Sequence, residues 1–199
     1  MTRRSGWTLA DLADAYLAGG ARFIQLRSKH ASSGAFLASC ADLVERAHKA
    51  GAIVIVNDRA DIAALSSADG VHVGQEDLDP ASVRKILGGS AIIGISTHTQ
   101  AQVRASSRLP VDYIAVGPLF GTSTKDTGYP AVGTALVGEA AAMIRAADSM
   151  TPIVAIGGIT LERAREVIEA GAASVAVISD LLSTGNPEAR VKEYLRALS

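Results

Sequence analysis

The sequence predicts an α/β fold, a (β/α)₈ (TIM) barrel, because two patterns recur along its 199 residues. Short, almost continuously apolar segments alternate with amphipathic helical patterns, which is typical of a parallel sheet whose strands are covered on both faces. The helical patterns end on glycine shortly before the next apolar segment, as in "LAGGARF" and "IEAGAAS". Such units either close into a barrel or form an open doubly wound sheet. The barrel is favoured because no Gly-x-Gly-x-x-Gly dinucleotide motif opens a first helix.

The helices have recognisable start and stop signals. Thr8 and Asp11 have the spacing of a capping box, which predicts a first helix that ends at the Gly19–Gly20 pair. The last helix is predicted to begin at Asn186, with Pro187 at its first helical position. Two further amphipathic patterns, over 35–50 and 160–170, each end at a glycine.

The strands are predicted from apolar segments rich in β-branched residues. There are seven such segments, at 22–27, 52–57, 69–74, 91–96, 112–117, 152–157 and 173–178. A closed eight-stranded barrel needs one more strand before the first helix, and no such apolar segment precedes Thr8 in this sequence. Either the sequence starts too late, or the barrel closes in an unusual way. We therefore expect an open edge beside the first predicted strand, which would favour association into a homo-oligomer.

Composition narrows the class of protein. No linker or low-complexity segment interrupts the pattern, so residues 1–199 are assigned to a single domain. The net charge of −1 without a basic run argues against nucleic-acid binding, and nothing favours a membrane surface. Cys40 is the only cysteine, which excludes an internal disulfide. The N-terminus lacks signal-peptide character, so a cytoplasmic protein is expected.

Polar residues follow the predicted strands in succession, at the strand ends where barrels carry their active sites. They include Gln25, Arg27, Lys29, Asn57, Asp58, Asp77, Ser96, Thr122, Ser123, Thr124, Lys125, Gly158 and Ser179. One polar group at one strand end means little, but a succession of them on one rim predicts a binding site.

Two carboxylates on this rim suggest a metal–diphosphate site. Asp58 and Asp77 follow adjacent predicted strands, and Mg²⁺ commonly binds through one or two carboxylates together with substrate phosphates. Arg27, Lys29 and Lys125 add positive charge for a diphosphate. The alternative is that Asp58 caps a helix and Asp77 pairs with a surface lysine.

Two other segments are candidate phosphate sites. The pair Gly157–Gly158 leads into a predicted helix start near Thr160, an arrangement that can hold an anion, although a tight turn would require glycine for backbone reasons alone. The loop "GTSTKDTG" offers hydroxyls, N–H groups and a lysine, although it could be a solvated connection. His72 lies inside an apolar strand and is interpreted as a packed histidine.

With these residues in place, the chain resembles the thiamine-phosphate synthase family from about residue 7 to its end. The motifs that carry the resemblance are "QLRSK", "VNDRADIA", "GVHVGQEDL", "GISTHT", "DYIAVGPLFGTSTK", "VAIGGIT" and "SVAVIS". The family usually has "QLREK", so Ser28 is a departure, and the family's first strand has no counterpart here.

The resemblance implies a role for each matching residue. Contacts to a pyrimidine diphosphate are implied for Gln25, Leu26, Arg27, Ser28, Lys29, Asn57, Ser96 and Lys125, of which Arg27, Lys29, Ser96 and Lys125 are the expected catalytic residues. Mg²⁺ ligation is implied for Asp58 and Asp77. Contacts to a thiazole phosphate are implied for Thr122, Ser123, Thr124, Gly158, Ile178 and Ser179.

The implied reaction is a Mg²⁺-dependent alkyl transfer between two small-molecule substrates. The 4-amino-2-methylpyrimidin-5-ylmethyl group would move from its diphosphate to the nitrogen of 4-methyl-5-(2-phosphooxyethyl)thiazole, giving thiamine phosphate and pyrophosphate. A related thiazole tautomerase would not need both aspartates and the full "QLRSK" set. A sugar-phosphate epimerase would want metal-binding histidines. A truncated, non-catalytic phosphate-binding barrel is the remaining alternative.

Overall fold

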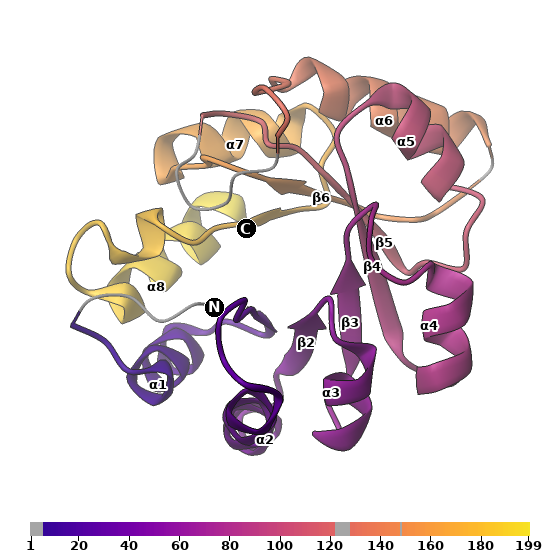
Figure 1. Cartoon of the computed structure of the whole chain (residues 1–199). Helices are drawn as coiled ribbons and strands as arrows, with labels where there is room; N and C mark the ends of the chain where they lie inside the picture. The colour runs from indigo at the N-terminus through magenta and orange to yellow at the C-terminus, as the bar shows by residue number, and fades with distance from the viewer. Residues whose placement is uncertain (1–5, 122–127, 148) are drawn as a thin grey trace.

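The protein is a curved parallel sheet with helices on its outer side (Figure 1). The computed structural model describes residues 6–121, 128–147 and 149–199. The strands are β1 (Phe23–Leu26), β2 (Ile53–Asn57), β3 (Gly70–Val73), β4 (Ile92–Thr97), β5 (Tyr113–Val116), β6 (Ile153–Ile156) and β7 (Ser174–Ala176). The helices are α1 (Leu9–Gly19), α2 (Ser33–Lys49), α3 (Ala60–Leu65), α4 (Pro80–Leu87), α5 (Gln100–Ser106), α6 (Ala135–Ala146), α7 (Leu161–Glu169), the 3₁₀ helix η1 (Asp180–Leu182) and α8 (Pro187–Leu198).

The order of strands in the sheet is their order in the chain, and all neighbouring pairs are parallel. The predicted α/β class and the seven strand segments are therefore confirmed. In the part of the chain that the structure describes, the sheet ends at β1 and β7 without an eighth strand between them, so the arrangement is a seven-stranded half-barrel.

The helix signals are confirmed at the first and last helices. Thr8 and Asp11 make both hydrogen bonds of a capping box, and Gly20 ends α1 in a left-handed conformation with φ 101°. The Asn186 side chain accepts a hydrogen bond from the backbone N–H of Ala189 at the start of α8. Each of these ends satisfies backbone groups that the helix alone leaves without partners.

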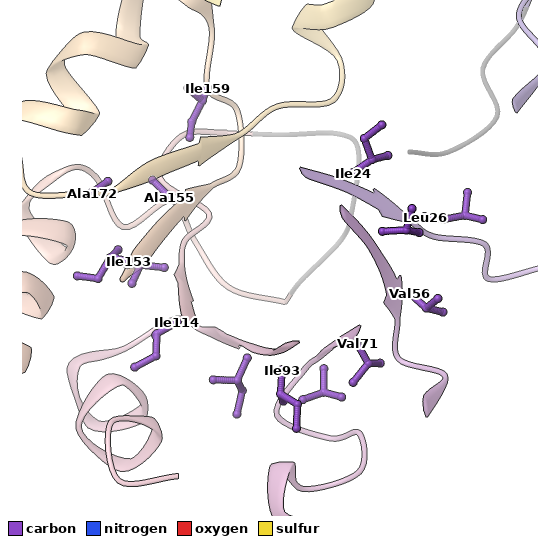
Figure 2. Close-up of a cluster of buried hydrophobic side chains, with 14 of the residues drawn as sticks. Ile24, Leu26, Val56, Val71, Ile93, Ile114, Ile153, Ala155, Ile159 and Ala172 are labelled. Carbon is purple, nitrogen blue, oxygen red and sulfur yellow. The ribbon is translucent and has the colours of Figure 1, made fainter. Parts of the chain in front are cut away.

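The main apolar core lies between the sheet and the helices. Figure 2 shows side chains of this layer, among them Leu26, Val56, Val71, Ile93 and Ile114, which are all fully buried. The central strands β3 and β5 are buried at every position, as predicted for strands covered on both faces.

The two edge strands depart from that prediction. The residues of β7 are exposed or half-buried, and Phe23 at the start of β1 is 48% exposed. A cavity of about 100 Å³ lies between these edges, lined by Phe23, Ile24, Val177 and Leu181 among others. The physical reason is position, because a strand at the end of a sheet has a neighbour on one side only.

The helical layer continues across this gap. α8 packs against both α7 and α1, and a Cβ added to Gly19 of α1 would lie 2.7 Å from Cβ of Val191 on α8. The two ends of the sheet are thus brought to the same side of the molecule, although β1 and β7 do not pair. Among the described helices, none combines the length and apolarity needed to cross a membrane.

Candidate active site

The candidate site occupies the rim formed by the carboxyl ends of the strands. Because all strands are parallel, residues that follow β1, β2, β4, β6 and β7 share one edge of the sheet. The structure therefore brings together most of the residues predicted from the sequence. Thr122, Ser123, Thr124 and Lys125, which the resemblance placed in the substrate loop, lie outside the described residues.

The "QLRSK" segment divides between the sheet and the loop after β1. Gln25 lies in β1 with its side chain in contact with Tyr113, on the inner side of the sheet. Leu26, the next residue, is fully buried in the outer apolar core, so only its backbone is available to a substrate. Arg27 and Ser28 are half-buried, and Lys29 is exposed at the rim.

Asn57 and Asp58 form the rim end of β2. Asn57 is 7% exposed at the last position of the strand. Asp58 has a left-handed backbone with φ 64°, and its N–H donates to the carbonyl oxygen of His72 at 2.8 Å. Aspartate tolerates this conformation better than most residues, and backbone outliers of this kind gather at functional sites.

The alternative readings of the two aspartates receive no support. The N-terminal cap of α3 is Arg59, without a side-chain capping bond, so Asp58 does not cap that helix. Asp77 accepts a hydrogen bond from the N–H of Gly74 at 2.7 Å, and within the described residues it makes no ion pair with a lysine. Among the described residues, no group of three or more His, Cys, Asp or Glu side chains is arranged to hold a metal ion. A Mg²⁺ site of two carboxylates completed by substrate phosphates does not need such a cluster.

Ser96 lies in β4 and belongs to a buried polar group. Its hydroxyl is 2.8 Å from Nε2 of His72, and Nδ1 of His72 is 2.9 Å from the hydroxyl of Tyr113. His72, Ser96 and Tyr113 are 7%, 4% and 6% exposed. The packed histidine expected from the sequence is thus buried, but it makes hydrogen bonds that connect two other polar side chains. Burial raises the pKa of Tyr113, which keeps its hydroxyl protonated.

The glycine turn after β6 approaches the segment that precedes the substrate loop. Gly157 and Gly158 have φ values of 92° and 67°. A Cβ at Gly157 would lie 2.5 Å from Pro118, and one at Gly158 would lie 2.7 Å from the carbonyl oxygen of Gly121. The N–H of Phe120 donates to the carbonyl oxygen of Gly157 at 3.1 Å. Glycine is therefore required here for backbone reasons, and the same contacts hold the start of the loop beside α7.

Two groups of supporting residues make contacts that the sequence did not predict, although His98 and Asp180 are both polar residues at strand ends. His98, after β4, stacks on Tyr129 with ring centres 4.2 Å apart, and Gln102 donates to the Tyr129 hydroxyl at 3.1 Å. These contacts hold the chain just after the undescribed part of the loop. The sequence offered only one indication of this stack, namely a histidine at the end of a predicted strand and a tyrosine after the loop.

The second group surrounds Asp180, next to Ser179. Its Oδ2 accepts from the Arg190 guanidinium at 2.9 Å, from the Tyr194 hydroxyl at 2.6 Å and from the N–H of Leu161 at 3.3 Å. One carboxylate thus ties the end of β7 to α8 and to the start of α7. The exposed residues Ile178 and Ser179 are held at the rim by this connection.

Comparison with known proteins agrees with the geometry. The sequence model of a family described as thiamine monophosphate synthase matches residues 2–181. A thiamine-phosphate synthase of Koribacter versatilis is 41% identical over 193 residues, which are 96% of this chain and 87% of that protein. One from Roseiflexus castenholzii is 42% identical over 185 residues, which are 93% of this chain and 79% of that protein.

A solved structure shows the same arrangement of elements. The thiamine phosphate pyrophosphorylase of Pyrococcus furiosus superimposes with a TM-score of 0.87 at 27% sequence identity, covering 100% of this chain and 95% of that one. The matches of sequence and fold extend over nearly the whole chain, and the chain therefore belongs to the thiamine monophosphate synthase family.

Proposed function

We propose that this chain is a thiamine-phosphate synthase, a transferase that joins a pyrimidine diphosphate to a thiazole phosphate. The observation that carries the proposal is the identity of about 40% with thiamine-phosphate synthases along almost the whole chain. The rim supports it, because Gln25, Asn57, Asp58 and Ser96 come together from three strands although they are distant in sequence.

The reaction breaks the bond between the pyrimidine methylene carbon and the diphosphate oxygen, and forms a bond from that carbon to the thiazole nitrogen. Negative charge grows on the departing pyrophosphate, so positively charged groups and hydrogen-bond donors beside it lower the barrier. Arg27 and Lys29 would provide this charge, and Ser96 and Asn57 would donate hydrogen bonds. No protein nucleophile is required, since the thiazole nitrogen captures the methylene carbon directly.

Asp58 and Asp77 are the proposed Mg²⁺ ligands. Both present hard carboxylate oxygens after adjacent parallel strands, and the bond from Gly74 N–H orients the Asp77 carboxylate. A bound Mg²⁺ would neutralise charge on the diphosphate. The remaining task of the protein is to hold the two substrates in line and to exclude water from the methylene carbon.

The complete (β/α)₈ barrel and the oligomeric state are further parts of the proposal. The seven parallel strands and their helices follow the order of such a barrel, and the exposed edge residues Phe23 and Ile178 would favour association of copies. Size-exclusion chromatography with light scattering tests the second point, and a monomer at all concentrations would contradict it. The cytoplasmic location stays a prediction.

The test is an endpoint assay of the purified chain with Mg²⁺ and both substrates, with thiamine phosphate detected by mass. We expect product that disappears with EDTA. Isomerised thiazole phosphate without coupled product would instead favour a tautomerase.

The metal ligands are tested separately. Asp58→Asn and Asp77→Asn should each raise the Mg²⁺ concentration needed for half-maximal rate by roughly tenfold or more. Asp14→Asn is the matched control, because this exposed carboxylate on α1 pairs with Arg46 away from the rim. An unchanged Mg²⁺ dependence in both site variants would contradict the assignment.

A further inference from the structure

We infer that Asp180 is a positioning residue for the thiazole phosphate, because its carboxylate anchors the rim segment 178–182 to α7 and α8. The rim segment contains Ile178 and Ser179, for which contacts to that phosphate are proposed. For its ligand the inference rests on the proposed function, which it deepens. The motif "SVAVIS", one of those that carry the family resemblance, ends at Ser179, so Asp180 lies outside it.

The rim segment has little apolar support of its own. The residues of β7, which leads into it, are exposed or half-buried, and Ile178 is 38% exposed. Together with Ile178, Leu181 and Leu182 line the cavity of about 100 Å³ between the two edges of the sheet. Segments with few buried apolar contacts open locally at a low cost in free energy. Hydrogen bonds and ion pairs therefore decide how firmly this segment is held.

Asp180 makes several such bonds through a single oxygen atom. Its Oδ2 accepts from Nε and Nη2 of Arg190 at 3.0 and 2.9 Å, from the Tyr194 hydroxyl at 2.6 Å and from the N–H of Leu161 at 3.3 Å. The side chains of Asp180 and Arg190 are only 12% and 11% exposed, so water competes little with these bonds. Burial raises the pKa of Tyr194, so its hydroxyl keeps the proton that it donates. Hydrogen bonds to a charged acceptor are roughly twice as strong as neutral ones.

These bonds connect the two sides of the proposed thiazole-phosphate site. Leu161 is the first residue of α7 and follows the turn that contains Gly158, whereas Asp180 directly follows Ser179. The bond between Leu161 and Asp180 therefore sets the spacing of two segments that are both proposed to contact the phosphate. The two α8 side chains that bind Asp180 add a fixed point outside the site, since α8 packs against α7 and α1. Without these bonds the rim segment would move relative to α7, and the phosphate would lose contacts on one side.

The local part of the inference is measured by amide hydrogen exchange of the ligand-free chain. The N–H of Leu182 donates to the carbonyl oxygen of Ser179 at 3.1 Å, so its exchange reports whether the rim segment is closed. Asp180→Ala should speed this exchange roughly tenfold or more, as expected when hydrogen bonds to a charged group are lost. The amides of the buried strand β3 should be unaffected. Equal exchange of Leu182 in the variant and the wild type would overturn the inference.

The effect on the ligand is measured by calorimetric titration with the thiazole phosphate, separately from turnover. Asp180→Ala should weaken its binding roughly tenfold, the loss expected for about one charge-assisted hydrogen bond. In this variant Arg190 would keep Glu193, which lies 2.8 Å away, so its charge stays paired. Asp180→Asn keeps an acceptor oxygen for the same donors and should weaken binding less.

A second ligand separates positioning from general destabilisation. Binding of pyrophosphate with Mg²⁺, proposed for the ends of β1 to β4, should change less than about twofold in Asp180→Ala, because sites without shared partners behave independently. Asp112→Ala is the matched control: Asp112 also accepts from an arginine, Arg84, at 2.7 Å and from a backbone N–H, that of Ile93, at 2.8 Å. It precedes β5 and so lies at the opposite edge of the sheet, and its loss should leave the affinity for the thiazole phosphate unchanged.

The outcomes distinguish this inference from the proposed function. Equal binding of the thiazole phosphate by the wild type and Asp180→Ala would overturn the inference and leave the proposed function standing. A wild-type chain that binds no thiazole phosphate would overturn both. If Asp180→Ala does not fold, Tyr194→Phe takes its place, because it removes a single oxygen atom and should weaken binding about threefold; unchanged binding there would count against the inference in the same way.

Discussion

Gly94 of β4 pairs with Tyr113 of β5, and the close approach of the tyrosine ring makes a sharp prediction about this glycine. In Gly94→Ala the new methyl carbon would start 2.0 Å from Cζ and 2.4 Å from Cε1 of Tyr113. Carbon atoms in ordinary contact are about 3.5–4.0 Å apart, so the ring must retreat by roughly 1.5–2 Å. The Tyr113 ring is 6% exposed, meets Phe23 edge to face and stacks on His72, so it cannot retreat without disturbing these two contacts.

The magnitude follows from the two interactions that such a shift disturbs. Overpacking a filled core costs about 1–3 kcal/mol. Loss of the buried hydrogen bond between Tyr113 and His72 adds about 1 kcal/mol. We therefore expect Gly94→Ala to lower the free energy of unfolding by about 2–4 kcal/mol, out of a total that is about 5–15 kcal/mol for most domains.

Urea denaturation monitored by circular dichroism measures this loss, provided that the slope of the transition is unchanged. The matched control is Gly34→Ala in the first turn of α2, where an added Cβ has nothing within 4 Å and alanine favours the helix. A second check is Tyr113→Leu, in whose background the added methyl group should cost less. Equal stability of Gly94→Ala and the wild type would refute the packing argument.

Three further predictions test other parts of the structure. Burial raises the pKa of the Cys40 thiol to about 12, so a thiol reagent at pH 8 should label it only after unfolding, and rapid labelling of the folded chain would contradict this. Arg190→Met leaves the largely buried Asp180 without its cationic partner and should lower the free energy of unfolding by about 3–5 kcal/mol in urea titrations; a loss below about 1 kcal/mol would count against the pair. Tyr129→Ala removes the stack on His98 and should raise KM for the thiazole phosphate about two- to tenfold, whereas an unchanged KM would show that the stack does not support the loop.

Much of the site could be predicted because the ends of parallel strands lie on the same edge of the sheet. Asn57 and Asp58 end one apolar segment and Ser96 ends another, so once the strands run in the same direction these residues must share a rim. Local signals were equally informative at the helix ends, where Thr8 with Asp11 makes its capping bonds within a single turn. Such short-range interactions join residues only a few positions apart, so the local sequence is enough to predict them.

Other features depend on residues that are distant along the chain. Nothing near His72 shows that Tyr113, 41 residues later, reaches its ring nitrogen, because the contact depends on strand register and on the space left by Gly94. The left-handed backbone of Asp58 likewise depends on a bond to the strand beside it.

The sequence by itself determined the strands, the helix ends and which polar residues lie on the rim, because these follow from local periodicity and capping. Only the tertiary structure decided that Leu26 turns its side chain into the outer core while Gln25 contacts Tyr113 on the inner side of the sheet, and that Asp180 ties three elements together. The physical reason is that packing and hydrogen bonding act between neighbours in space, and the register of the sheet determines which residues those are.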